Sequence, residues 1–169
     1  MTKQTRRAAL LAARAGLAPE DRRAGDAARD AVLAGLLEGA RVAAYASFGT
    51  EPSTAGLVDE AVLLPVVRPD RDLDWTAGGV LLGVEAVAGC DVVLVPALAV
   101  DRRGVRLGRG GGSYDRALRR ARGLVVALLH EGELVDELPA EPHDMPVHAV
   151  ALPSGLVRLR GPAGGALRE

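Results

Sequence analysis

One stretch of the sequence, residues 91–122, constrains the fold more than any other part of the chain. It begins with an uninterrupted apolar run at residues 92–95, and such runs are typical of strands buried on both faces of a parallel sheet. A proline, an acidic residue and several arginines follow, then three glycines at 110–112, and then a pattern that predicts a helix over residues 113–122. Such a succession is suited to holding an anion, because free backbone N–H groups and the helix dipole point the same way. We expect that anion to be a phosphate.

The rest of the chain alternates between helix and strand patterns. Helices are predicted over residues 3–15, with Thr2 as N-cap, and over residues 19–39, with Pro19 in the first turn. Strands are predicted at residues 41–47, 62–67, 123–130, 148–152 and 155–159. The other segments are predicted as a short helix (53–60), polar irregular chain (68–79 and 131–146), either a strand or a loop (80–88), and a frayed tail from Gly161.

This alternation predicts an α/β fold of three layers in a single domain that spans residues 1–169. The sheet is expected to be mostly parallel and flanked by helices, in the manner of sugar-phosphate isomerase and CoA transferase-like folds. In such sheets the ligand lies at the carboxyl ends of the strands. The loops that carry Glu51 and residues 101–115 are both predicted to leave such ends.

Composition excludes several classes of function. The chain has 21 basic and 22 acidic residues, so a net charge of −1 gives no reason to expect a nucleic-acid partner. Cys90 is the only cysteine, which excludes an internal disulfide and fits a reducing compartment, with this residue in the core. The N-terminus has no secretory apolar region, and no apolar stretch approaches membrane-spanning length. We therefore expect a cytoplasmic monomer with no membrane partner.

Several established motifs are absent. Lys3 is the only lysine, so the G-x-x-x-x-G-K-[ST] loop of nucleotide triphosphatases does not occur. A dinucleotide-binding G-x-G-x-x-G fails because Ser113 stands at the last glycine, and Leu134 stands where a zinc protease would need its second histidine after His130. No G-x-S-x-G nucleophile elbow is present either.

The stretch nevertheless contains the parts of a phosphate site. Its glycines allow close backbone approach to phosphate oxygens, and Arg103, Arg106 and Arg109 offer forked donors. Asp115 could hold Mg²⁺ through one carboxylate, with phosphates and water completing the shell. Structural roles are also open to each of them: a tight turn for the glycines, the start of a helix for Asp115, and solvation for the arginines.

These residues also resemble a known family. The run VLVPALAVDRRGVRLGRGGGSYDRAL is similar to the signature of 5-formyltetrahydrofolate cyclo-ligases, also called 5,10-methenyltetrahydrofolate synthetases. Lys3-x-x-x-Arg7, residues 45–54 and LVDELPAEPHDMPVHAV resemble three further segments of that family in the same order. Ser113 departs from the usual Y-Y-D, His148 replaces a usual aspartate, and the segment before Cys90 is shortened.

The resemblance implies ATP- and Mg²⁺-dependent conversion of 5-formyltetrahydrofolate to 5,10-methenyltetrahydrofolate, with release of ADP and phosphate. It implies catalytic roles for Arg109, Tyr114 and Asp115, and Mg²⁺ binding by Asp115. It also implies contacts to ATP from two sets of residues, the basic pair Lys3 and Arg7 and the turn residues Arg106, Gly108, Arg109, Gly110, Gly111, Gly112, Ser113 and Tyr114. The implied contacts to the folate come from Tyr45, Phe48, Glu51, Trp75 and Tyr114. For His143 and Asp144 we expect a structural role in a loop.

Two other interpretations stay open at this stage. One is a divergent relative that keeps the nucleotide site but acts on another substrate or on none. The other is a non-catalytic module that binds a phosphorylated metabolite on the same scaffold. A nucleic-acid role for the R-G-G-G run is the weakest, because the chain lacks a basic field.

Overall fold

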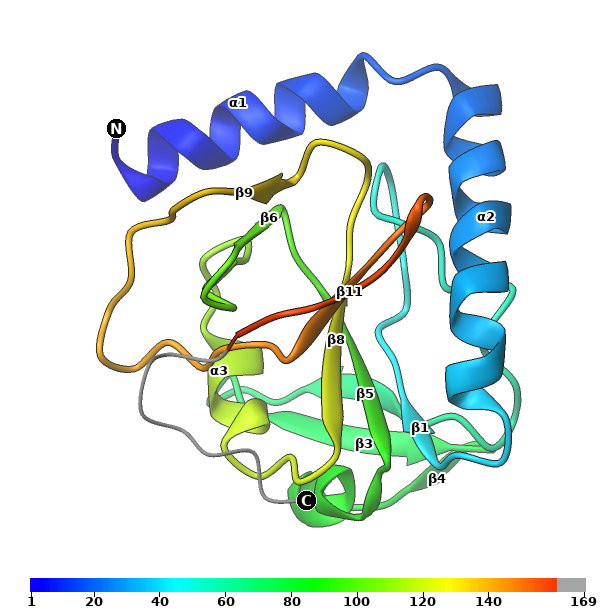
Figure 1. Ribbon diagram of the computed structural model, residues 1–169. Helices are drawn as coiled ribbons and strands as arrows, with labels where there is room; N and C mark the ends of the chain where they lie inside the picture. Colours follow the sequence, from blue (N-terminus) through cyan, green and yellow to red (C-terminus); the bar gives the residue numbers. More distant parts are fainter. Residues whose placement is uncertain (161–169) are drawn as a thin grey trace.

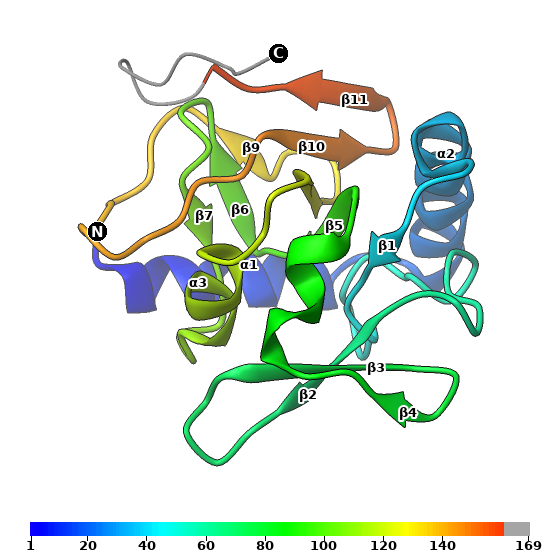
Figure 2. The ribbon, with the colours of Figure 1, turned by 90° about the horizontal axis from the view of Figure 1, so that it is seen from below.

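The computed structural model describes residues 1–160, and its centre is a five-stranded sheet in the order β1-β5-β8-β10-β11 (Figures 1 and 2). The first four strands run parallel and β11 is antiparallel to β10. The strands are β1 (Val42–Ala43), β5 (Val92–Pro96), β8 (Leu124–Leu128), β10 (Ala149–Leu152) and β11 (Gly155–Arg158). The predicted fold class, a mostly parallel sheet with flanking helices, is confirmed.

Alternate side chains of the central strands fill two separate cores. In β5, Val92 and Leu94 belong to the core beneath helix α2, whereas Val93 and Val95 belong to the core on the opposite face. β8 and β10 divide their side chains in the same way, as the two-residue period of a strand requires. Helix α2 (Pro19–Leu37) covers the first face through the fully buried Leu33. The second face is covered by α3 (Ser113–Leu118) and by a smaller sheet.

Two small sheets complete the fold. One has the order β2-β3-β4 and is antiparallel, with β2 (Leu64–Val67), β3 (Leu73–Ala77) and β4 (Val80–Leu81). It is followed by a 3-10 helix, η1 (Val84–Gly89), that leads into β5. The other has the order β7-β6-β9, with β6 (Ala99–Asp101), β7 (Arg106–Leu107) and β9 (Leu134–Val135). Helix α1 (Lys3–Ala15) lies across this third sheet (Figure 1), where Leu10 packs against its apolar side chains.

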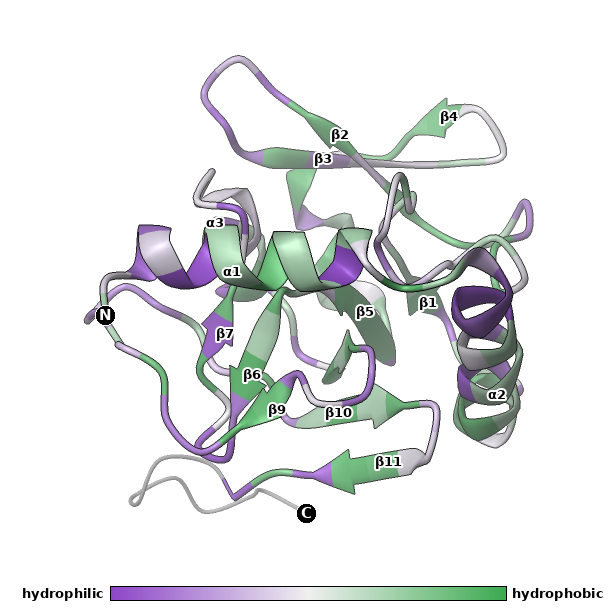
Figure 3. Ribbon diagram, turned by 90° about the horizontal axis from the view of Figure 1, so that it is seen from above, coloured by the Kyte–Doolittle hydropathy of each residue, from purple (hydrophilic) through white to green (hydrophobic). Residues whose placement is uncertain are grey.

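The apolar colouring of β5, β6 and β10 contrasts with the polar N-terminal end of α1 (Figure 3), so the helix presents charged residues where it passes the strand ends. Helices α1 and α2 begin where the sequence predicted, and the hydroxyl of Thr2 accepts a hydrogen bond from the N–H of Thr5 as an N-cap. Within residues 1–160, no helix is both long and apolar enough to cross a membrane.

Several predicted elements differ from the structure. The helix over 53–60 does not form, because the Thr54 hydroxyl donates to Tyr45 O and the Ser53 hydroxyl accepts from Ala55 N–H in a local turn. Residues 68–79 are not irregular, since they contain β3. Alternation of apolar and polar residues at 73–77 was the overlooked signal.

Three further differences concern lengths. β1 is shorter than residues 41–47, and on its other edge Ala44 N–H bonds to Leu63 O. Helix α3 ends at Leu118 rather than at 122, and the polar segment 131–146 contains β9. Residues 80–88, which the sequence left undecided, form β4 and most of η1. The tail predicted to fray lies outside the described residues.

Two histidines make the stability of this fold depend on pH. Neutral His148 accepts a hydrogen bond from Val125 N–H through Nδ1 at 2.9 Å, and burial lowers its pKa. Burial likewise lowers the pKa of His130, against a raising effect of Thr50 O. Both histidines bind protons more readily in the unfolded chain. Their effect on the free energy of unfolding is therefore absent above about pH 6.5, and the free energy of unfolding falls as the pH drops from there toward the folded pKa values.

We therefore expect urea denaturation to show lower stability at pH 5.5 than at pH 7.5. In His148→Asn, Oδ1 can still accept from Val125 N–H but cannot titrate, so the fall between the two pH values should be smaller than in the wild type. An equal fall in both proteins would contradict a contribution from His148.

Candidate active site

A cavity of about 830 Å³ opens at the carboxyl ends of β1 and β5, where the sequence predicted a ligand. Residues from both predicted loops line it, together with the N-terminal half of α1. Of the predicted site residues, those on its wall are Lys3, Arg7, Tyr45, Phe48, Glu51, Arg106, Gly108, Arg109, Gly110, Gly111, Gly112, Ser113, Tyr114 and Asp115. One cavity thus brings together side chains that are more than one hundred residues apart in the chain.

The glycine turn forms part of the cavity wall immediately before α3. Gly110 and Gly112 have φ angles of 103° and 75°, a left-handed conformation that side chains disfavour. Arg7 comes from α1 and donates through Nε to Gly108 O at 2.8 Å. A Cβ added at Gly110 would lie 3.4 Å from the Arg7 guanidinium carbon. The turn therefore needs glycine, and it holds a cation directly beside the backbone.

Arg106 is a largely buried cation of the cavity, with its side chain 6% exposed. Its Nη1 donates to Pro96 O at 2.9 Å, its Nη2 lies 3.7 Å from Asp115 Oδ1, and its guanidinium lies 5.5 Å from the centre of the Tyr114 ring. Nε has no hydrogen-bond partner among residues 1–160, and burial lowers the pKa of this side chain. Arg106 lines the cavity, and a buried donor without an acceptor is suited to binding an anion.

Asp115 and Tyr114 lie at the start of α3, below the turn. Asp115 Oδ1 accepts a hydrogen bond from Met145 N–H at 3.2 Å, so α3 is joined to the segment that precedes β10. Burial raises the pKa of Tyr114, which keeps its hydroxyl protonated. The Asp115 carboxylate remains partly exposed to the cavity.

Arg109 lies between two residues of the loop after β1. Its guanidinium stacks over the Phe48 ring at 4.8 Å, and its Nε lies 3.6 Å from Glu51 Oε1. Glu51 Oε2 also accepts from Phe48 N–H at 3.0 Å, and the Glu51 side chain is only 6% exposed. Tyr45 supports this loop, because its hydroxyl donates to Pro52 O at 2.6 Å.

The loop at residues 141–145 contributes more to the cavity than the sequence predicted. Glu141, His143 and Asp144 line the cavity, and their possible ligand atoms lie within 4.8 Å of one another. Lys3 Nζ donates to Asp144 Oδ2 at 3.0 Å. Burial raises the pKa of Asp144, but the Glu141 N–H and Lys3 outweigh it and the net shift is downward. His143 and Asp144, for which the sequence predicted a structural role in a loop, therefore also form part of the cavity wall.

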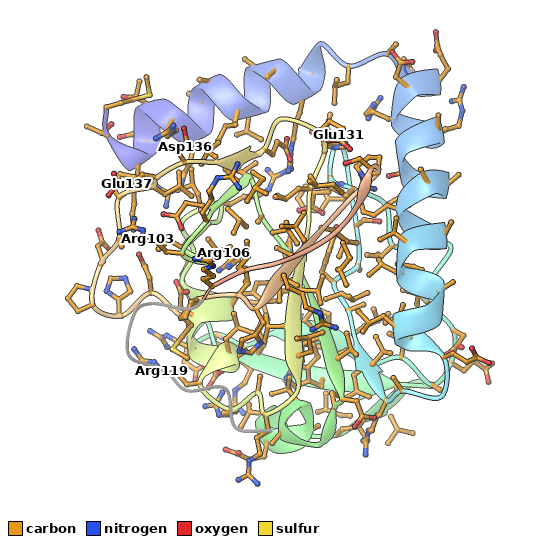
Figure 4. All side chains as sticks on the ribbon, viewed as in Figure 1. Arg103, Arg106, Arg119, Glu131, Asp136 and Glu137 are labelled. Carbon is orange, nitrogen blue, oxygen red and sulfur yellow. The ribbon has the colours of Figure 1, made fainter. Side chains whose placement is uncertain are left out.

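Two predicted residues do not face the cavity. Trp75 is 1% exposed, packs in a core cluster with residues of α3, and is not among the residues that line the cavity. Leu73, two residues earlier and on the same face of β3, lies in the same core. Arg103 lies outside the lining as well, because it pairs with the buried Asp101 and donates to Leu138 O (Figure 4). Asp101 shapes the β6–β7 turn by accepting from Arg103 N–H and Val105 N–H.

Arg14 is a cavity residue that sequence reasoning overlooked. It is 2% exposed and forms a bidentate ion pair with Glu133, with both N–O distances 2.8 Å. The signal was its spacing, since Lys3, Arg7 and Arg14 are four and seven residues apart and share one face of α1.

Comparison with known proteins gives a consistent result. A sequence profile described as the 5-formyltetrahydrofolate cyclo-ligase family matches residues 79–153. The 5-formyltetrahydrofolate cyclo-ligase of Mycolicibacterium smegmatis is 41% identical over 94% of this chain and 98% of the relative. The solution structure of Aquifex aeolicus 5,10-methenyltetrahydrofolate synthetase is similar with a TM-score of 0.78 and 28% identity, over 100% of this chain and 97% of that one. A synthetase of the same name from Mycoplasma pneumoniae shares the fold, with a TM-score of 0.78 at 20% identity over 90% of this chain and 99% of the other.

Proposed function

Because this chain belongs to the 5-formyltetrahydrofolate cyclo-ligase family, we propose that it converts 5-formyltetrahydrofolate to 5,10-methenyltetrahydrofolate with ATP and Mg²⁺, releasing ADP and phosphate. One observation carries the proposal most strongly. The single cavity has a cationic half, built from α1 and the glycine turn, next to an acidic and apolar half built from the loop after β1. That arrangement suits a reaction in which a phosphoryl group must meet a second, planar substrate.

The chemistry that we propose has two steps. The formyl oxygen of the folate attacks the γ-phosphorus of ATP and ADP leaves, which converts a poor leaving group into a phosphate. The N10 amine of the folate then attacks the activated formyl carbon, the C–O bond breaks, phosphate leaves with the original formyl oxygen, and N10 loses its proton. The enzyme's task is to position two ligands and to balance charge on the phosphates.

The cations of the cavity are proposed to hold ATP. Arg106 is buried with one unsatisfied donor, so it can bind a phosphate oxygen with little loss of side-chain entropy. Lys3 and Arg7 reach the same space from α1, and the turn from Gly108 to Ser113 offers backbone N–H groups. Arg109 contacts Glu51 and borders the turn, so it joins the nucleotide half to the folate half.

The acidic side chains fit a role on the metal and on the folate. Asp115 and Asp144 both line the cavity, and carboxylate oxygens are the protein ligands that Mg²⁺ prefers, so these two residues would hold it. When bound, Mg²⁺ would neutralise phosphate charge. Glu51 offers a carboxylate to adjacent N–H donors of the pterin, and Tyr45, Phe48 and Tyr114 offer aromatic surface.

We also propose that residues 1–169 act as one domain, as a monomer in the cytoplasm. The lone cysteine is buried, in keeping with a reducing compartment.

The proposal is tested by mixing the purified protein with 5-formyltetrahydrofolate, ATP and Mg²⁺ and following the near-ultraviolet absorbance of the methenyl product. We expect product only when all three are present, with one ADP formed per product. ATP binding without product would favour a divergent relative with another substrate. Binding of phosphorylated compounds without any turnover of ATP would favour a non-catalytic module.

A further inference from the structure

The turn between β2 and β3 presents an arginine to the glycine turn from outside the motif that identifies the family. A Cβ added at Gly111 would lie 3.1 Å from Arg71 Nη1. Arg7 lies similarly close to Gly110, because a Cβ added at Gly110 would lie 3.4 Å from the Arg7 guanidinium carbon. Two arginines from distant elements therefore lie beside consecutive glycines of the proposed phosphate turn.

The backbone holds Arg71 in an unusual conformation. Its φ of 68° makes it the only residue other than glycine with a positive φ among residues 1–160. The turn is closed by hydrogen bonds from Arg71 N–H to Arg68 O and from Arg68 N–H to Asp72 O. A left-handed arginine is disfavoured, and such conformations persist where the surrounding structure enforces them, often at functional sites.

The surroundings enforce it through α3, the helix that follows the glycine turn, and through the residues just after that helix. Arg116 donates to Asp70 O at 2.6 Å, and Arg120 pairs with the Asp72 carboxylate through two bonds of 2.7 Å. Figure 3 shows the β2–β3 turn above the region of α3. The residues on both sides of Arg71 are thus fastened, so the turn that carries Arg71 is held beside the glycines.

Arg71 itself has no acidic partner. Among residues 1–160 its guanidinium forms no hydrogen bond or ion pair, whereas its neighbours Arg68, Arg116 and Arg120 are all engaged. An exposed and unpaired guanidinium beside the proposed phosphate turn is complementary to a dianionic phosphate.

We propose that Arg71 is an additional phosphate-binding residue, which contacts the polyphosphate of the nucleotide from the side opposite Arg7. The inference rests on the proposed function, in that the glycine turn holds phosphates. It extends the site to the small antiparallel sheet, so the β2–β3 turn and α1 hold the same ligand from two directions.

Arg71→Gly separates a ligand role from a structural one. Glycine accepts a positive φ without strain, so the variant should keep or exceed the wild-type melting temperature. Its affinity for ATP and for inorganic tripolyphosphate, measured by titration calorimetry, should fall about 10-fold or more, the effect of one charged hydrogen bond. Arg68→Ala is the matched control from the same turn and should bind both probes as the wild type does.

The possible outcomes distinguish the two proposals. Wild-type affinity for both probes in Arg71→Gly would overturn the role of Arg71 and leave the proposed function intact. A wild-type protein that binds neither probe would overturn both. An equal loss in Arg68→Ala would show that general charge on the turn, rather than Arg71, is responsible, and would also overturn the inference.

Discussion

Replacing Asp115 with alanine is expected to lower turnover at least about 100-fold while the protein stays folded, because groups that stabilise transition-state charge commonly contribute this much. The carboxylate lies in the cavity with Arg106 at 3.7 Å, and its one backbone bond is to Met145 N–H. The assay is steady-state formation of the methenyl product, with the circular dichroism spectrum as the measure of folding. Asp136→Ala is the control, because the Asp136 side chain is 97% exposed and is not among the residues that line the cavity.

A second variant separates charge from architecture. Asp115→Asn keeps an oxygen that can accept from Met145 N–H but removes the charge, so the α3 connection should survive. We expect it to need a much higher Mg²⁺ concentration for half-maximal rate, and to remain well below the wild-type maximum. Wild-type turnover in Asp115→Ala would remove this residue from the proposed metal site.

The central strands were predictable because their side chains are buried on both faces, and a short apolar run such as residues 92–95, bounded by polar residues and a proline, strongly favours a buried strand. The place of Trp75, in contrast, was not predictable from the local sequence. The family resemblance implied that Trp75 contacts the folate, but its place in β3 puts the ring in the core. The position of the Trp75 ring depends on which other strands pair with β3. Pairing between distant segments cannot be predicted from a local sequence pattern.

The residues of the site also divide into those that the sequence could predict and those that it could not. The glycine turn and its arginines are adjacent in sequence, so their cooperation was foreseeable, whereas Asp144 and Arg14 enter the cavity only through tertiary contacts. Asp144 reaches it by bonding Lys3, from the other end of the chain. Arg103 shows the converse case: it belongs to the same motif as Arg106, but Asp101 binds it two residues away and turns it from the cavity. Local polar partners outweigh motif membership in deciding where a long side chain points.

The buried pair of Arg14 and Glu133 is expected to give the largest effect on stability. Arg14 also donates to Ala97 O, and Glu133 Oε2 accepts from His130 N–H, so the pair joins α1 to the loops after β5 and β8. Removing one partner leaves a buried charge uncompensated, which typically costs about 3–5 kcal/mol. Arg14→Met should therefore lower the free energy of unfolding by about that amount, measured by urea denaturation with the fluorescence of Trp75, the only tryptophan.

The double variant Arg14→Met/Glu133→Gln distinguishes loss of a charge pair from loss of packing. If the cost comes from the orphaned carboxylate, the double variant should be clearly less destabilised than the sum of the two single variants, because it leaves no unpaired charge. Arg102→Met is the control, since the exposed Arg102–Asp136 pair at 3.5 Å should contribute less than about 1 kcal/mol.

Because α1 also carries Lys3 and Arg7, Arg14→Met should raise the KM for ATP more than that for the folate, even where the protein is fully folded. Strict additivity in the cycle, or equal effects on the two KM values, would show that the pair does not position α1 over the nucleotide half of the cavity.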